Sequence, residues 1–121
     1  MANILVTDDE ELVRFTIREM LEAHGHVVSE AKDGNELIAH CNQHATDIVV
    51  TDIIMPEKEG IESIIELKQD RPEIKVLAIS GGGRTKNMDF LDVAKQFGAN
   101  GVLAKPFTEE ELIEAINELL A

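Results

Sequence analysis

The chain has 121 residues, which is enough for one domain with a single hydrophobic core. Acidic residues outnumber basic ones by 24 to 11, and the formal net charge of −13 disfavours direct contact with nucleic acid or an anionic lipid surface. Aromatic residues make up only 3% of the chain, so few rings are available to stack on a flat cofactor or an exposed base.

The single cysteine and the lack of long apolar runs indicate where the protein resides. Cys41 cannot form an internal disulfide, which is compatible with a reducing compartment. No basic-then-apolar leader opens the chain, and no apolar run approaches the roughly 18 residues of a membrane span. We therefore expect a cytoplasmic protein with no membrane partner and no direct nucleic-acid partner.

Short apolar segments alternate along the chain with segments of helical periodicity. The apolar stretch 3–7 is followed by 10–25, where apolar residues recur at the i, i+4, i+7 and i+8 spacing of a helix. The β-branched stretch 26–31 is followed by a predicted helix over 33–44, which begins at Asp33 with the spacing of a capping box. The alternation indicates that strands and helices follow one another in turn.

The same alternation continues to the end of the chain. Further strands are predicted at 47–54, 74–80 and 101–104, and further helices at 58–70, at 85–97 and from Thr108 onwards. Near-continuous apolar strands are typical of a parallel sheet covered on both faces. With right-handed crossovers, the five strands and five helices predict one α/β domain over 1–121, a flavodoxin-like doubly wound sheet of strand order 2-1-3-4-5.

Polar residues follow four of the predicted strands, at the edge where an open parallel sheet places its ligand site. Asp8, Asp9 and Glu10 follow the first strand, the third strand ends near Asp52, Ser80 ends the fourth, and Lys105 follows the fifth. Taken alone, Asp8 or Asp9 fits an ordinary helix N-cap equally well. Asp52 is harder to explain in that way, because a carboxylate in an apolar strand costs several kcal/mol unless it is paired or metal-bound.

This set of residues suits phosphoryl chemistry. Clustered carboxylates repel one another and need a cation, and Mg²⁺ takes carboxylate oxygens while keeping waters and phosphate oxygens as further ligands. An Asp can act as the nucleophile towards a phosphoryl group and form an acyl phosphate. A lysine ammonium and a serine hydroxyl can then stabilise the charge on the phosphoryl oxygens.

Four segments, VTDDEE, TDIIMPEKEG, LAIS and LAKPF, resemble in order and spacing the receiver domain of two-component response regulators. The resemblance covers essentially the whole chain. Its most specific parts are the D-x-x-M-P-x-x-x-G segment that runs from Asp52 to Gly60 and the K-P-F segment at Lys105–Phe107.

The resemblance implies a role for each matching residue. Asp52 corresponds to the phosphoacceptor, which receives its phosphoryl group from a histidine kinase or a histidine phosphotransfer protein. Asp8 and Asp9 correspond to the acidic pair that holds Mg²⁺ together with Asp52, and Ile54 corresponds to the position whose backbone carbonyl completes the metal site. Ser80 corresponds to the switch hydroxyl and Lys105 to the lysine that contacts the phosphoryl group.

The resemblance also implies a signalling role rather than an enzymatic one, apart from self-phosphorylation and autodephosphorylation. Pro106 is expected to follow a cis peptide. The output is expected to be altered binding of an unknown downstream protein through the loop 80–87 and the surface of the fourth helix, fifth strand and fifth helix.

The sequence departs from the family pattern at two places. Val102 stands where the family usually carries an aromatic ring that swings inward, so we expect the loop and helix to move instead. Gly81, Gly82 and Gly83 lack Cβ atoms, which lets the loop after Ser80 hold two arrangements of similar energy. Gly82 and Ile54 also replace polar groups near the acceptor, which should change the lifetime of the acyl phosphate.

Three alternatives accompany this interpretation. The chain is expected to be a free-standing regulator, and the alternative is a receiver module of a larger regulator or of a hybrid histidine kinase. A phosphatase with an Asp nucleophile is disfavoured, because Ile53 and Ile54 follow Asp52 in place of the usual D-x-D motif. His40 and His44 have the i, i+4 spacing of a metal site, although two surface histidines explain them more simply.

Overall fold

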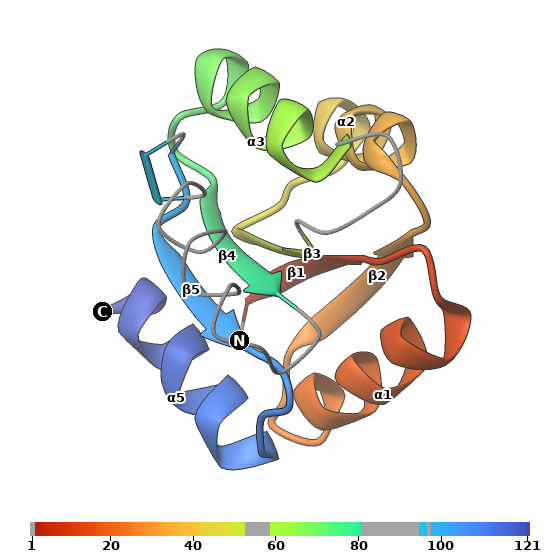
Figure 1. The fold of residues 1–121 in the computed structure, drawn as a ribbon, viewed down its shortest axis with the longest axis vertical. Helices are drawn as coiled ribbons and strands as arrows, with labels where there is room; N and C mark the ends of the chain where they lie inside the picture. The colour runs from red at the N-terminus through yellow and green to blue at the C-terminus, as the bar shows by residue number, and fades with distance from the viewer. Residues whose placement is uncertain (1, 53–58, 81–94, 97) are drawn as a thin grey trace.

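The computed structural model describes residues 2–52, 59–80, 95–96 and 98–121 and contains one five-stranded parallel sheet (Figure 1). The strands are β1 (Asn3–Thr7), β2 (Val27–Ala31), β3 (Ile48–Asp52), β4 (Lys75–Ser80) and β5 (Gly101–Ala104). All four neighbouring pairs are parallel, and the spatial order is β2-β1-β3-β4-β5. The predicted sheet and its strand order are confirmed.

Helices cover both faces of the sheet (Figure 1). The described helices are α1 (Glu11–Glu22), α2 (Gly34–Gln43), α3 (Glu59–Asp70) and α5 (Glu109–Leu120). Helices α2 and α3 lie over one face, and α1 and α5 lie over the other. The predicted helix over 85–97 falls mostly outside the described residues, and its described residues Lys95 and Gln96 are helical. Within the described chain, no helix combines the length and apolar character needed to cross a membrane.

The central strands are apolar throughout because each face of the sheet packs into its own hydrophobic cluster. On β1, Leu5 belongs to the cluster beneath α2 and α3, whereas Ile4 and Val6 belong to the cluster beneath α1 and α5. Every residue of β3 is buried. The alternation matters for the site, since residues spaced by two along a strand point to the same face.

Side-chain hydrogen bonds cap the N-termini of α2 and α5. The Asp33 carboxylate accepts a hydrogen bond from the Glu36 amide at the start of α2 (2.9 Å), and Thr108 and Glu111 form a complete capping box at the start of α5. Both caps were predicted from the sequence. The N-cap residue of α1 is Glu10, whose side chain makes no capping hydrogen bond.

Asn100 fixes β5 beside β4 and so positions the residues that follow β5. Its side-chain oxygen accepts hydrogen bonds from the Val76 amide (2.9 Å) and the Lys68 ammonium (3.0 Å). The Asn100 amide in turn donates to the Val76 carbonyl (2.8 Å). Burial, followed by the charge of Lys75, lowers the pKa of Lys68. The start of β5 is therefore held by polar contacts as well as by the strand ladder.

We expect the free energy of unfolding to fall as the pH drops below about 6.5, partly because of His26. Its Nδ1 accepts a hydrogen bond from the Ala2 amide (3.2 Å), and burial, assisted by the charge of His24, lowers the pKa of His26. The unfolded chain therefore binds this proton more tightly, so stability is full above the unfolded pKa and is lost as the pH falls through the folded one.

The variant His26→Asn tests this expectation, because its side-chain oxygen can accept the same hydrogen bond and does not titrate. Thermal unfolding followed by circular dichroism between pH 7.5 and 5.5 should give a shallower pH dependence for His26→Asn than for the unaltered chain. Some pH dependence should remain in His26→Asn, because burial and then the charge of His44 lower the pKa of His40. Equal slopes for the two proteins would contradict the role of His26.

Candidate functional site

The carboxylates of Asp8 and Asp52 come together at the carboxyl edge of the sheet. In the register of β1 and β3, Val6 pairs with Val50 and Thr7 with Thr51, so Asp8 and Asp52 occupy the next positions of neighbouring strands. The ladder extends to Asp8, whose amide donates to the Ala31 carbonyl of β2 (3.3 Å). Only 1% of Asp8 and 7% of Asp52 is exposed. Two carboxylates are therefore buried side by side.

Lys105 provides the positive charge between them. Its Nζ lies 3.2 Å from Asp52 Oδ2 and 3.3 Å from Asp8 Oδ2. Burial by itself lowers the pKa of Lys105, but the charges of Asp52 and Asp8 and the hydrogen bonds to both outweigh it, so the pKa is raised above its ordinary value. The ammonium is thus held in its charged form between carboxylates from two different strands.

The loop between β1 and α1 gathers a second set of carboxylates. One carboxylate oxygen from each of Asp8, Asp9 and Glu10 lies within 4.8 Å of the others. Asp8 is buried whereas Asp9 and Glu10 are exposed, and Asp8 Oδ1 accepts a hydrogen bond from the Glu10 amide (2.8 Å). Hard oxygen donors that are partly open to solvent fit Mg²⁺, which prefers such ligands and retains several waters.

The structure answers some of the questions that the sequence left open here. Asp8 binds the Glu10 amide within the loop instead of capping α1, whose N-cap is Glu10 itself. Glu10, which was not among the predicted metal ligands, belongs to the carboxylate cluster. Ile54, the predicted carbonyl ligand, lies outside the described residues.

The structure describes three of the remaining predicted residues, Ser80, Val102 and Pro106. Ser80 is the last residue of β4 and pairs with Ala104 in the register with β5, which puts its backbone at the same edge. Val102 lies on β5, is partly buried, and packs against the cluster beneath α2 and α3. The Lys105–Pro106 peptide is cis, as the resemblance implied. The glycine run 81–83 lies outside the described residues.

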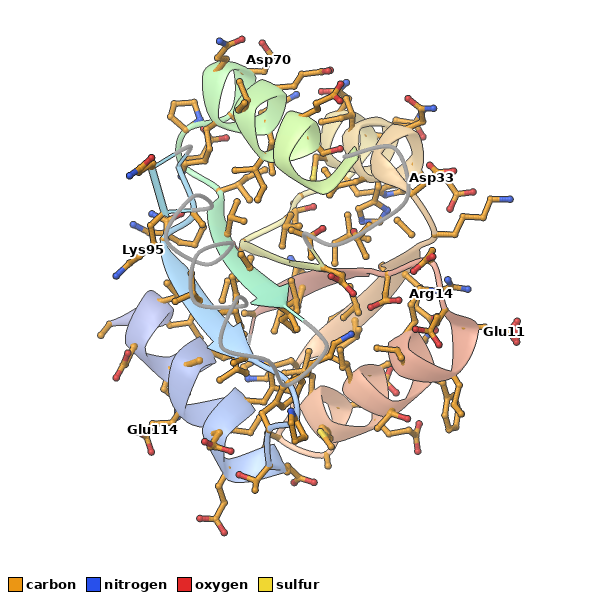
Figure 2. All side chains as sticks on the ribbon, viewed as in Figure 1. Glu11, Arg14, Asp33, Asp70, Lys95 and Glu114 are labelled. Atoms are coloured by element: carbon orange, nitrogen blue, oxygen red, sulfur yellow. The ribbon has the colours of Figure 1, made fainter. Side chains whose placement is uncertain are left out.

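Arg14 is a site residue that the sequence analysis did not single out. Its Nη1 donates a hydrogen bond to the backbone carbonyl of Asp8 (2.6 Å), and its Nε donates to the Glu30 carboxylate of β2 (3.1 Å). Figure 2 shows Arg14 near the start of α1, whereas Asp70 lies at the end of α3, well away from it. The only sequence signal was an arginine one turn into the helix after the acidic loop.

An apolar groove adjoins the charged site. Its volume is about 600 Å³, and it lies between α1 and the segment that joins β5 to α5. The groove is lined by Leu12, Val13, Thr16, Ile17, Met20, Lys105, Pro106 and Phe107. Leu12 is 75% exposed and Phe15 on the same helix is 53% exposed. Lys105 thus belongs both to the charged site and to an apolar surface beside it.

The histidines of α2 give no sign of a second metal centre. The rings of His40 and His44 stack with their centroids 4.6 Å apart. Among the described residues, the acidic loop is the only group of three or more potential ligands close enough to share an ion. Two surface histidines remain the simpler explanation of the pair.

Comparison with known proteins places this geometry in a family. The family model described as the response regulator receiver domain matches residues 4–117. The chemotaxis protein CheY of Bacillus subtilis is 35% identical, and the match covers 97% of this chain and 96% of that protein.

Two solved structures share the fold. A response regulator receiver domain protein from Clostridium thermocellum is 33% identical with a TM-score of 0.88, covering 99% of this chain and 94% of that one. NtrX from Brucella abortus is 32% identical with a TM-score of 0.91, covering 98% of this chain but only 27% of NtrX. The chain therefore belongs to the receiver domain family of two-component response regulators.

Proposed function

We propose that this chain accepts a phosphoryl group on Asp52 from a histidine kinase or a histidine phosphotransfer protein, and that phosphorylation changes its binding to a downstream protein. The observation that carries the proposal is the contact of the Lys105 ammonium with both Asp52 (3.2 Å) and Asp8 (3.3 Å). This contact supports the proposal because it joins the proposed nucleophile to a positive charge, beside a cluster of metal-compatible oxygens.

In the proposed reaction, a carboxylate oxygen of Asp52 attacks the phosphorus atom of a phosphohistidine. A P–O bond forms, the P–N bond breaks, and the imidazole of the donor leaves with the electron pair. Lys105, already beside Asp52 Oδ2, is in place to contact an oxygen of the incoming phosphoryl group. Asp8, Asp9 and Glu10 offer oxygens that would hold Mg²⁺, which when bound supplies positive charge for the phosphoryl oxygens.

The proposed unit is a single receiver domain over 1–121 that acts as a free-standing regulator in the cytoplasm. The near-complete match to CheY of Bacillus subtilis supports this choice, and the match to 27% of NtrX supports the alternative of a module within a larger regulator or hybrid kinase. A net charge of −13 argues against nucleic acid or membrane as a direct partner. The phosphatase alternative remains disfavoured because the D-x-D motif is missing.

Replacing the acceptor tests the proposal most directly. We expect Asp52→Asn to abolish labelling by a small phosphodonor in the presence of Mg²⁺, because an amide oxygen is a far weaker nucleophile than a carboxylate. The matched control is Asp70→Asn, since Asp70 is an exposed carboxylate at the end of α3. Labelling is measured by intact-protein mass spectrometry. Undiminished labelling of Asp52→Asn would overturn the assignment of the acceptor.

Replacing Lys105 tests the balance of charge at the site. Without Mg²⁺, Lys105→Met should lower the free energy of unfolding by about 1–3 kcal/mol, because two buried carboxylates lose their ion pair. The same variant should bind Mg²⁺ roughly fivefold more tightly or better, because it no longer places a competing cation beside the ligands.

Chemical denaturation and calorimetric Mg²⁺ titration measure these two effects. Lys75→Met, which removes an exposed lysine at the opposite end of β4, controls for the change in net charge. An equal Mg²⁺ affinity for Lys105→Met and Lys75→Met would show that Lys105 and the metal do not compete.

The proposed output requires movement of the loop 80–87 and of the surface of the fourth helix, β5 and α5. Since Val102 has no ring to swing, we expect a phosphate mimic bound with Mg²⁺ to change the loop conformation. Backbone amide resonances of the loop, compared between the free and bound states by NMR, report this change. The mechanism fails if only the Val102 side chain responds while the loop stays still.

A further inference from the structure

Arg14 braces the acidic loop against the neighbouring strand. It lies one turn after the N-cap of α1, where its amide donates to the Glu10 carbonyl (3.1 Å). Its side chain is only 14% exposed. One nitrogen of the guanidinium binds the Asp8 carbonyl at 2.6 Å and another binds Glu30 Oε1 at 3.1 Å. The planar group therefore joins the loop after β1 to the side chain of a residue in β2.

Both carboxylate oxygens of Glu30 accept hydrogen bonds from arginines, so the side chain that Arg14 binds is itself held in place. Its second oxygen, Oε2, accepts a hydrogen bond from Arg18 Nη1 (3.1 Å), and Arg18 Nε pairs with Glu22 (3.1 Å). The backbone of Glu30 is paired with Val6 in the parallel ladder of β1 and β2. A guanidinium that is bonded to an anchored carboxylate through one nitrogen and to a backbone carbonyl through another has little freedom to turn.

Two other hydrogen bonds hold Asp8, and each fixes a different group. The Asp8 amide donates to Ala31, and the Asp8 carboxylate accepts from the Glu10 amide. The Asp8 carbonyl oxygen, in turn, accepts a hydrogen bond from Arg14. That carbonyl belongs to the planar peptide that joins Asp8 to Asp9, so its orientation fixes where the Asp9 nitrogen and Cα lie.

We propose that Arg14 is a positioning residue for the divalent cation: by holding the Asp8 carbonyl it fixes the Asp8–Asp9 peptide, and so the placement of the two carboxylates relative to each other. The inference rests on the proposed function, since it concerns the Mg²⁺ ligands of the same site. Arg14 touches neither the ion nor the phosphoryl group in this account.

The direction in which Mg²⁺ affinity changes when Arg14 is replaced distinguishes a positioning role from a purely electrostatic one. A guanidinium beside the metal ligands repels a divalent cation, so removing its charge should by itself strengthen Mg²⁺ binding. Loss of the brace has the opposite effect, because ligands that are no longer held in place bind less tightly. Glu30 neutralises much of the Arg14 charge at a distance of 3.1 Å, which favours the effect of positioning.

The test compares Arg14→Met with Arg18→Met in the full chain. Both variants remove one arginine of α1 that pairs with Glu30, but only Arg14 contacts the acidic loop. Mg²⁺ affinity is measured from NMR amide shifts, because the chain has no Trp or Tyr for intrinsic fluorescence. We expect Arg14→Met to weaken Mg²⁺ binding about tenfold, Arg18→Met to leave it nearly unchanged, and Arg14→Lys to recover only part of the affinity.

A second measurement uses the metal-free protein. Hydrogen exchange of the Glu10 amide, which is bonded to Asp8 Oδ1, should become several-fold faster in Arg14→Met and not in Arg18→Met. This measurement tests the brace even if the chain proves not to bind Mg²⁺ or not to accept a phosphoryl group. Unchanged or tighter Mg²⁺ binding by Arg14→Met, unchanged exchange, or equal effects in the two variants would overturn the inference.

Discussion

The geometry of the site depends on one ammonium shared between two buried carboxylates. Asp8 and Asp52 are 1% and 7% exposed, and side by side they would repel each other strongly without a cation. Lys105 reaches both at 3.2–3.3 Å from a strand that is not a neighbour of either β1 or β3. β4 lies between β5 and β3, and both β4 and β3 lie between β5 and β1, so the ammonium contacts carboxylates well beyond its own strand.

Alternate side chains of each strand point to the same face of the sheet, and this alternation brings the three charged side chains together. Val6, Val50 and Leu103 all belong to the cluster beneath α1 and α5, and each stands two residues before one of the three charged residues. Asp52 at the end of β3, and Asp8 and Lys105 directly after β1 and β5, therefore continue the same alternation. A shift of one residue in any of these registers would turn the charged side chain towards α2 and α3.

A functional residue can be recognised in the sequence where it conflicts with its surroundings or stands in a specific motif. Asp52 stands out because a carboxylate in an apolar strand needs a partner, and Lys105 is identified by the K-P-F motif beside it. Arg14 could not be recognised in the same way, because Arg14 and Arg18 both fit the polar side of an amphipathic helix. The two arginines differ only once α1 packs on β2. Arg14 then lies 2.6 Å from the Asp8 carbonyl, whereas Arg18 pairs with Glu22 and Glu30.

Lys105 belongs both to the charged site and to the wall of the apolar groove. Its ammonium lies in the carboxylate cluster, while its side chain lines the apolar groove with Phe107 and residues of α1. A phosphoryl group on Asp52 would offer this ammonium a stronger anion than the carboxylates it now contacts. Any displacement of Lys105 towards that group would change one wall of the groove, so the charge state of Asp52 and the shape of an apolar surface would vary together.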